Sequence, residues 1–169
     1  MHSVKRETCR GFEFQVIRVF EQQNLCDSII DLAEHAIRIA EKDDPELPTL
    51  YSIVFLNRLK VGQYTEAYES LVANPDSDRR KDCLRQLIVT LFDSEMLDAL
   101  VEFSFAGMQN DLERIVEGRA RSLDVSDNKY YDFLYAFHTL KGNTRKGKRD
   151  PCFFFLQWDY YEVFKNLIF

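Results

Sequence analysis

The sequence contains few of the residues that most often interrupt regular structure. It has only 6 glycines and 4 prolines among 169 residues, too few for a loop-rich β-protein. No segment alternates apolar and polar residues in the way that a half-buried strand does. No stretch reaches the roughly 18 uncharged apolar residues that a membrane-spanning helix needs. These absences favour a helical protein of one domain without a transmembrane segment.

Cysteines and basic residues are also too sparse for several functions. Cys9, Cys26, Cys83 and Cys152 are widely separated, so none forms the close pairs of zinc or redox motifs. We interpret them as reduced, intracellular thiols, because the polar first ten residues also lack the apolar region of a secretory signal. A formal net charge of −6 argues against broad binding to nucleic-acid phosphates, which needs a basic surface. Any partner is therefore expected to be a protein.

Neither of two histidines on predicted helices has a partner that would suggest chemistry. His35 and His138 both lack a second ligand at a metal-binding spacing such as that of H-E-x-x-H. A satisfied or exposed histidine is the better interpretation of each. The sequence also lacks a phosphate-binding Gly-rich loop, a G-x-S-x-G elbow and a recognisable Cys–His pair. We therefore predict no enzyme, cofactor, metal or small-molecule substrate, and we assign no catalytic or binding residues.

One pair of carboxylates was considered as a catalytic candidate. Glu113 and Glu117 are four residues apart, which places them on one face of a helix, as paired carboxylates require. Arg114 and Arg121 are close by and favour a salt-bridged surface instead.

Apolar residues recur at helical spacing along most of the chain and predict about eight helices joined by short turns. The most regular stripe joins Leu84, Leu87, Ile88, Leu91 and Phe92, so Leu87 and Leu91 should be buried at the centre of a helix over 79–92. Side chains that could cap helix starts, and glycines that could end helices, punctuate the pattern. The cap candidates are Asp27, Thr49, Ser94, Asn110 and Asp127, and the end candidates are Gly62 and Gly142.

The segment from Leu59 to Pro75, LKVGQYTEAYESLVANP, is typical of a tetratricopeptide-like hairpin. Gly62 can end one helix and Tyr64 can begin the next. Ala67, Tyr68, Leu71 and Val72 then share one face. Each such pair leaves an apolar face that only the next pair can cover. We therefore predict an all-α, irregular α-solenoid of antiparallel helical hairpins, with a closed helical bundle as the alternative.

Two segments near the end of the chain depart from this pattern. Residues 141–149 form a basic run with two glycines, which nuclear import receptors could read, although a solvated loop is the favoured interpretation. Residues 153–169 are crowded with aromatic and aliphatic side chains, so this segment must dock, bind a partner or drive association. We expect this segment to remain undocked rather than to pack against the preceding hairpin. The predicted domains are a solenoid segment over 1–147 and a divergent basic and aromatic tail over 148–169.

Long ordered strings give a more specific signal than periodicity. The strings DCLRQLIVTLFDSEMLDALVEFSF from Asp82, ERIVEGRARSLD from Glu113 and YYDFLYAFHTLKGNTRKG from Tyr130 resemble the helical region of the 160-kilodalton nucleoporin family. With FQVIRVFEQQNL and YTEAYESL, the resemblance covers residues 8–147. The remaining KRDPCFFFLQWDYYEVFKNLIF does not resemble the further helix expected there. We therefore interpret the chain as a fragment, a variant transcript or the product of an imperfect gene model.

The resemblance implies a piece of the α-helical solenoid that follows a β-propeller in that family. Its members are scaffold subunits of the Y-shaped complex in the outer rings of the nuclear pore, at the nuclear envelope. The implied roles are architecture, messenger RNA export and protein import, through contacts with other nucleoporins. The alternative is a stand-alone tetratricopeptide-like adaptor that holds a peptide in a groove, for which a lining of Asn, Lys and Arg would be expected.

Overall fold

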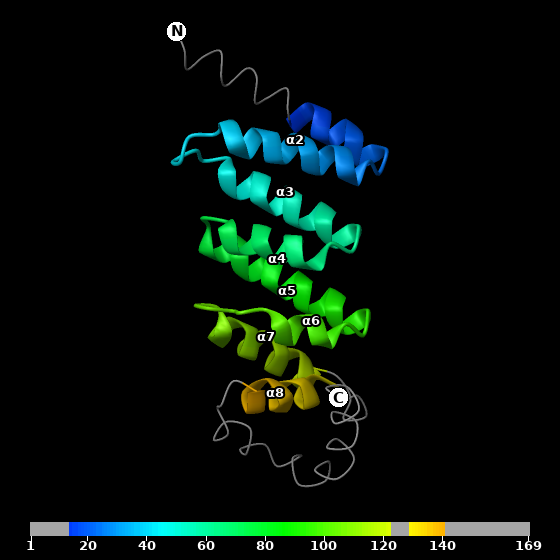
Figure 1. Cartoon of the computed structure of the whole chain (residues 1–169), viewed down its shortest axis with the longest axis vertical. Coiled ribbons are helices and arrows are strands. Elements are labelled where there is room, and N and C mark those ends of the chain that lie inside the picture. Colours follow the sequence, from blue (N-terminus) through cyan, green and yellow to red (C-terminus); the bar gives the residue numbers. More distant parts are fainter. Residues whose placement is uncertain (1–13, 123–128, 141–169) are drawn as a thin grey trace. The chain divides into compact units, whose positions relative to one another are not determined.

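The computed structural model describes residues 14–122 and 129–140, and the part that it describes is helical without strands (Figure 1). The prediction of an all-α fold is confirmed. A first helix covers residues 14–22. It is followed by α2 (Cys26–Ile39), α3 (Leu47–Lys60), α4 (Tyr64–Ala73), α5 (Ser77–Asp93), α6 (Leu97–Glu102), α7 (Gln109–Ser122) and α8 (Lys129–Leu140).

The chain divides into two compact units, 1–112 and 113–169. In the first unit the main contacts run from α2 to α3, from α3 to α4 and α5, from α4 to α5, and from α5 to α6. Helices α2 to α6 therefore lie in sequence order along an open stack (Figure 1). An open stack of hairpins is the expected solenoid and not the closed bundle that was the alternative.

Three hairpin turns in the first unit share one backbone conformation. Asn24, Gly62 and Glu95 each have a positive φ, of 54°, 79° and 58°. At the second turn, the Gly62 N–H donates to the Leu59 carbonyl at 3.2 Å and the next N–H donates to the Arg58 carbonyl at 2.9 Å. The other two turns repeat the same pair of bonds. This is the Schellman ending of a helix, so the predicted helix end at Gly62 is confirmed and recurs at two positions without glycine.

The residue after each left-handed position begins the next helix at once. These N-cap residues have nearly the same backbone angles, at φ −84°, ψ 65° for Leu25, −83°, 69° for Gln63 and −97°, 53° for Met96. None of them caps its helix with a side-chain hydrogen bond. The backbone of the turn therefore sets where α2, α4 and α6 begin, without a capping side chain.

The four predicted side-chain caps that lie among the described residues are wrong, and two of them are wrong for this reason. Asp27 lies in the first turn of α2, and Ser94 is the C-cap of α5. At both places the tight backbone turn, and not a side chain, sets where the next helix begins. Thr49 lies inside α3, which begins two residues earlier with Pro48 in its first turn. Asn110 is the second residue of α7. Asp127 and Gly142 lie outside the described residues.

The first unit is held together by an apolar core that runs through successive hairpins. Leu87 and Leu91 are fully buried, as their stripe predicts. The other fully buried side chains include two more from α5 and several from α3, α4 and α6, namely Leu84, Ile88, Val54, Phe55, Leu71 and Leu100. Val72 is expected on the packed face of α4 but is 49% exposed. The packed face is centred on Ala67 and Leu71, which are fully buried.

Aromatic packing joins α4 to the segment that follows α6. The Tyr68 ring stacks on Phe103 with centroids 4.4 Å apart, and it meets the edge of Phe105 at 5.5 Å. The Phe105 N–H donates to the Tyr68 hydroxyl oxygen at 3.0 Å. Burial raises the pKa of the Tyr68 hydroxyl, and this hydrogen bond partly opposes the rise. The second and third hairpins are therefore linked by packing and by a hydrogen bond.

The second unit contains the part of α7 from Glu113 onward, together with α8. Phe133, Leu134 and Phe137 of α8 are buried. The rings of Phe133 and Phe137 stack with centroids 5.8 Å apart. These residues form the stripe that the sequence predicts for this helix. The predicted domain boundary after residue 147 and the aromatic tail lie outside the described residues and stay predictions.

Candidate interaction surfaces

Of the histidines and glutamates singled out in the sequence, the structure brings His138 and Glu113 together. His35 is exposed on α2. Within residues 14–122 and 129–140, no group of three or more His, Cys, Asp or Glu side chains could hold a metal ion. Over the same ranges, no helix is long and apolar enough to span a membrane.

His138 differs from the interpretation as a satisfied or exposed histidine. It is buried, and its Nδ1 makes no hydrogen bond with a described residue. The Glu113 Oε1 lies 3.9 Å away, and the two side chains are 8% and 12% exposed. The buried position follows from the packing of α8 in the second unit, where the His138 ring also meets the edge of Phe137.

The two carboxylates of α7 have different surroundings. Glu117 lies 3.4 Å from Arg121 one turn later, and both side chains are well exposed. The predicted salt-bridged surface is confirmed for this pair. Glu113 faces His138 instead, so the two glutamates occupy separate environments.

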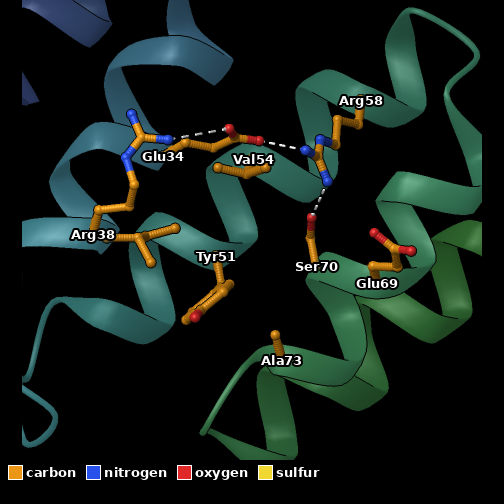
Figure 2. Close-up of a pocket in the computed structure, with 9 residues that line it drawn as sticks. Glu34, Arg38, Tyr51, Val54, Arg58, Glu69, Ser70 and Ala73 are labelled. Carbon is orange, nitrogen blue, oxygen red and sulfur yellow. Dashed lines mark hydrogen bonds and ion pairs between the residues drawn. The ribbon is translucent and has the colours of Figure 1, made fainter.

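A groove lies in the first unit between α2 and α4, over α3 (Figure 2). It encloses about 260 Å³. Its lining consists of Glu34, Ile37 and Arg38 from α2, Tyr51, Val54 and Arg58 from α3, and Glu69, Ser70 and Ala73 from α4. Two consecutive hairpins therefore build one recess.

Arg58 closes one end of the groove by binding both neighbouring helices. Its Nη1 donates to the Glu66 carbonyl at 2.8 Å and to the Ser70 hydroxyl at 3.0 Å. Its Nη2 donates to the Glu34 carboxylate, across to the preceding hairpin. The Arg58 side chain is only 19% exposed, so these charge-assisted bonds are partly shielded from water. The network fixes α2, α3 and α4 relative to one another.

Three other polar side chains around the groove can make further hydrogen bonds or ion pairs. Arg38 is 65% exposed, and Glu34, at 3.9 Å, is its only ion-pair partner among the described residues. The Glu69 carboxylate and the Tyr51 hydroxyl make no hydrogen bond or ion pair with a described residue. Arg38 and Glu69 stand on opposite sides of the groove (Figure 2). This site could not be recognised from the sequence, because its residues are drawn from positions 34–73 and none belongs to a local motif.

A second candidate surface lies along the hairpin turns. Leu25, Val61 and Met96 belong to the three equivalent turns and are 45%, 41% and 45% exposed. These turns lie on the same edge of the stack (Figure 1). Apolar side chains exposed one at a time are ordinary on a protein surface, so these three residues alone do not identify an interface.

Comparison with known proteins agrees with the repeated hairpins. The family model described as NUP160/120 middle TPR matches residues 2–149. The Nup160 homolog of Drosophila melanogaster, a nuclear pore complex protein, is 54% identical over 135 residues, which cover 80% of this chain and 10% of that protein. Nup160 of Homo sapiens is 40% identical over 132 residues, or 78% of this chain and 9% of that protein.

A more distant relative is also a nucleoporin. The nucleoporin NUP120 of Chaetomium thermophilum is 23% identical over 128 residues, covering 72% of this chain and 10% of its own length. The chain thus spans about a tenth of the relatives that it matches. The matched segment contains the hairpins described above, and the chain belongs to the NUP160/120 middle TPR family.

Proposed function

We propose that this chain is a structural scaffold segment of a nucleoporin in the Y-shaped complex of the nuclear pore outer ring. It acts at the nuclear envelope through contacts with other nucleoporins and supports messenger RNA export and protein import. The observation that carries the proposal is the family match over residues 2–149, together with relatives that are nuclear pore complex proteins. A direct role in binding nucleic acid is not part of the proposal, because the formal net charge is −6.

The physical features of the first unit suit a scaffold. Its hairpins repeat one turn geometry, and each helix packs on its neighbours in the chain. The hydrogen bonds of Arg58 and the stacking of Tyr68 on Phe103 connect successive hairpins. A stack built in this way resists bending because adjacent repeats share buried contacts. Such a segment can hold a fixed spacing between binding surfaces.

The stand-alone peptide adaptor is the weaker candidate. A peptide-clamping groove was expected to be lined by Asn, Lys and Arg. The groove between α2 and α4 contains two arginines but also two glutamates and no Asn or Lys. One of those arginines, Arg58, is already occupied by Glu34 and Ser70. The groove therefore lacks the Asn, Lys and Arg lining that is expected of a stand-alone adaptor.

A segment exchange tests the proposal. Residues 2–149 would replace the matched segment of the Drosophila Nup160 homolog, in fly cells depleted of the endogenous protein. We expect the chimera to reach the nuclear rim and to restore the export of polyadenylated RNA. An unrelated α-helical repeat of equal length in the same position is the control and should fail. If the chimera behaves like this control, the proposed scaffold role is wrong.

A further inference from the structure

The groove between α2 and α4 has an apolar floor and a rim of opposite charges. Val54 is only 2% exposed at the floor, and Ile37, Tyr51 and Ala73 also line it. Arg38 on α2 and Glu69 on α4 face each other across the opening (Figure 2). The lining is thus apolar at its centre and charged at its two edges.

The size of the groove restricts what can occupy it. Its volume of about 260 Å³ lies below the roughly 300–1,000 Å³ of ordinary small-molecule and cofactor sites. A large apolar side chain from a peptide fits a recess of this scale. The Tyr51 hydroxyl, which makes no hydrogen bond with a described residue, is available to the peptide backbone.

The rim charges restrict the occupant further. The reachable cation is Arg38, because Arg58 is held by Glu34, Glu66 and Ser70. The reachable anion is Glu69, because Glu34 is held by Arg58 and is less exposed. A matching peptide therefore needs an acidic residue on the α2 side and a basic residue on the α4 side.

We propose that this groove binds an extended segment of a protein partner that inserts one large apolar side chain, with an acidic residue two positions to one side of it and a basic residue two positions to the other. The apolar side chain occupies the floor, the acidic residue pairs with Arg38, and the basic residue pairs with Glu69. This inference adds a partner-binding site to the proposed scaffold role. It rests on that role only in taking the partner to be a protein. Because its test uses peptides in solution, its failure would leave incorporation into the pore untouched.

Short peptides and the full chain provide the test. The probes are acetylated, amidated pentapeptides with Leu or Ala at the centre and Gly on each side of it, and their end residues are Asp and Lys, two Asp residues or two Lys residues. Binding is followed by NMR through the side-chain methyl groups of Ile37 and Val54. We expect the mixed-charge peptide with Leu to bind most tightly. Replacing its Leu by Ala should weaken binding by roughly tenfold or more, given the value of burying one large apolar side chain.

A charge reversal distinguishes specific recognition of the peptide charges from nonspecific binding. Glu69→Lys makes both edges of the groove basic, so the peptide with two Asp residues should become the preferred ligand. Glu66→Lys is the matched control, because its side chain is also exposed on α4 but does not line the groove. It should leave the ranking of peptides unchanged.

Three results would overturn the inference. The first is an absence of methyl shifts with the mixed-charge Leu peptide. The second is an unchanged ranking of peptides in the Glu69→Lys variant. The third is the appearance of the same methyl shifts when the protein is concentrated without peptide, since this would assign the groove to a second copy of the chain.

Discussion

The side-chain amide of Asn74, at the end of α4, donates a hydrogen bond at 3.0 Å to the carbonyl oxygen of Pro48, at the start of α3. The same Nδ2 lies 3.2 Å from the Ser52 hydroxyl, and the Oδ1 accepts the Asp76 N–H at 3.0 Å. The Asn74 carbonyl accepts a bond from Arg80. One residue, 1% exposed, therefore ties together α3, α4 and α5.

Asn74→Ala should lower the free energy of unfolding by about 1–3 kcal/mol, because it removes the side-chain hydrogen bonds to Pro48, Ser52 and Asp76. Chemical denaturation of the full chain measures the change. Asn110→Ala is the control, since Asn110 is exposed on α7 and should have little effect. Equal effects of the two substitutions would show that the Asn74 bonds do not stabilise the stack.

Gly62→Ala should destabilise the protein through its backbone. An added Cβ would meet nothing within 4 Å, but Gly62 has a φ of +79°, a conformation that costs about 1–2 kcal/mol for a residue with a Cβ. Gly118→Ala is a matched control in α7, where the added Cβ also meets nothing, and it should stabilise by roughly 0.5–1 kcal/mol. Thermal and chemical unfolding should therefore move in opposite directions for the two variants. A shift of the same sign in both would contradict the role of the turn.

Leu87→Ala should cost about 2–5 kcal/mol of stability as a large-to-small change in a packed core. Leu87 is fully buried, and its removal leaves a cavity between helices. Val72→Ala provides the comparison, because Val72 is 49% exposed and should change stability by less than about 0.5 kcal/mol. A cost below about 0.5 kcal/mol for Leu87→Ala would mean that α5 is not central to the core.

Acid should destabilise the protein partly through Asp76, the N-cap of α5. Its carboxylate accepts the N–H groups of Arg79 and Asp78, at 2.8 and 2.9 Å. The bond from Arg79 is the largest cause that holds the pKa of Asp76 below its usual value. Because the folded pKa is below the unfolded one, this stabilisation is present above the unfolded pKa and is lost as pH falls through the folded pKa.

Asp76→Asn retains a capping oxygen but removes the titration. Denaturation at a series of acidic pH values should therefore show a shallower fall in stability for this variant than for the natural chain. Asp31→Asn is the control, because Asp31 is exposed and makes no ion pair or hydrogen bond with a described residue. If Asp76→Asn and the natural chain lose stability in parallel, the cap does not contribute to the acid dependence.

The helices could be predicted from the sequence because their apolar stripes are local. Leu87 and Leu91 repeat at helical spacing, and their burial follows directly. Gly62 marked its turn because glycine favours a positive φ. Asn24 and Glu95 adopt the same conformation at the other two turns, but neither residue type signals it strongly. The three turns therefore did not look alike in the sequence.

The groove could not be predicted, because it depends on contacts between distant positions. Glu34 and Arg58 are 24 residues apart and come from different hairpins. Their pairing requires the packing of α2 on α3, which no local pattern specifies. The errors in the helix caps have a related cause, since the backbone at Leu25 and Met96 starts α2 and α6 without a capping side chain.

Affinity purification of the segment-exchange chimera tests the scaffold role most directly. The Drosophila Nup160 homolog carrying residues 2–149 of this chain would be isolated beside the unmodified homolog, and the outer-ring nucleoporins in each would be quantified by mass spectrometry. We predict that the chimera recovers them in the same proportions as the unmodified protein. A folded chimera that recovers none of them would contradict the proposal that this chain is a scaffold segment of the pore.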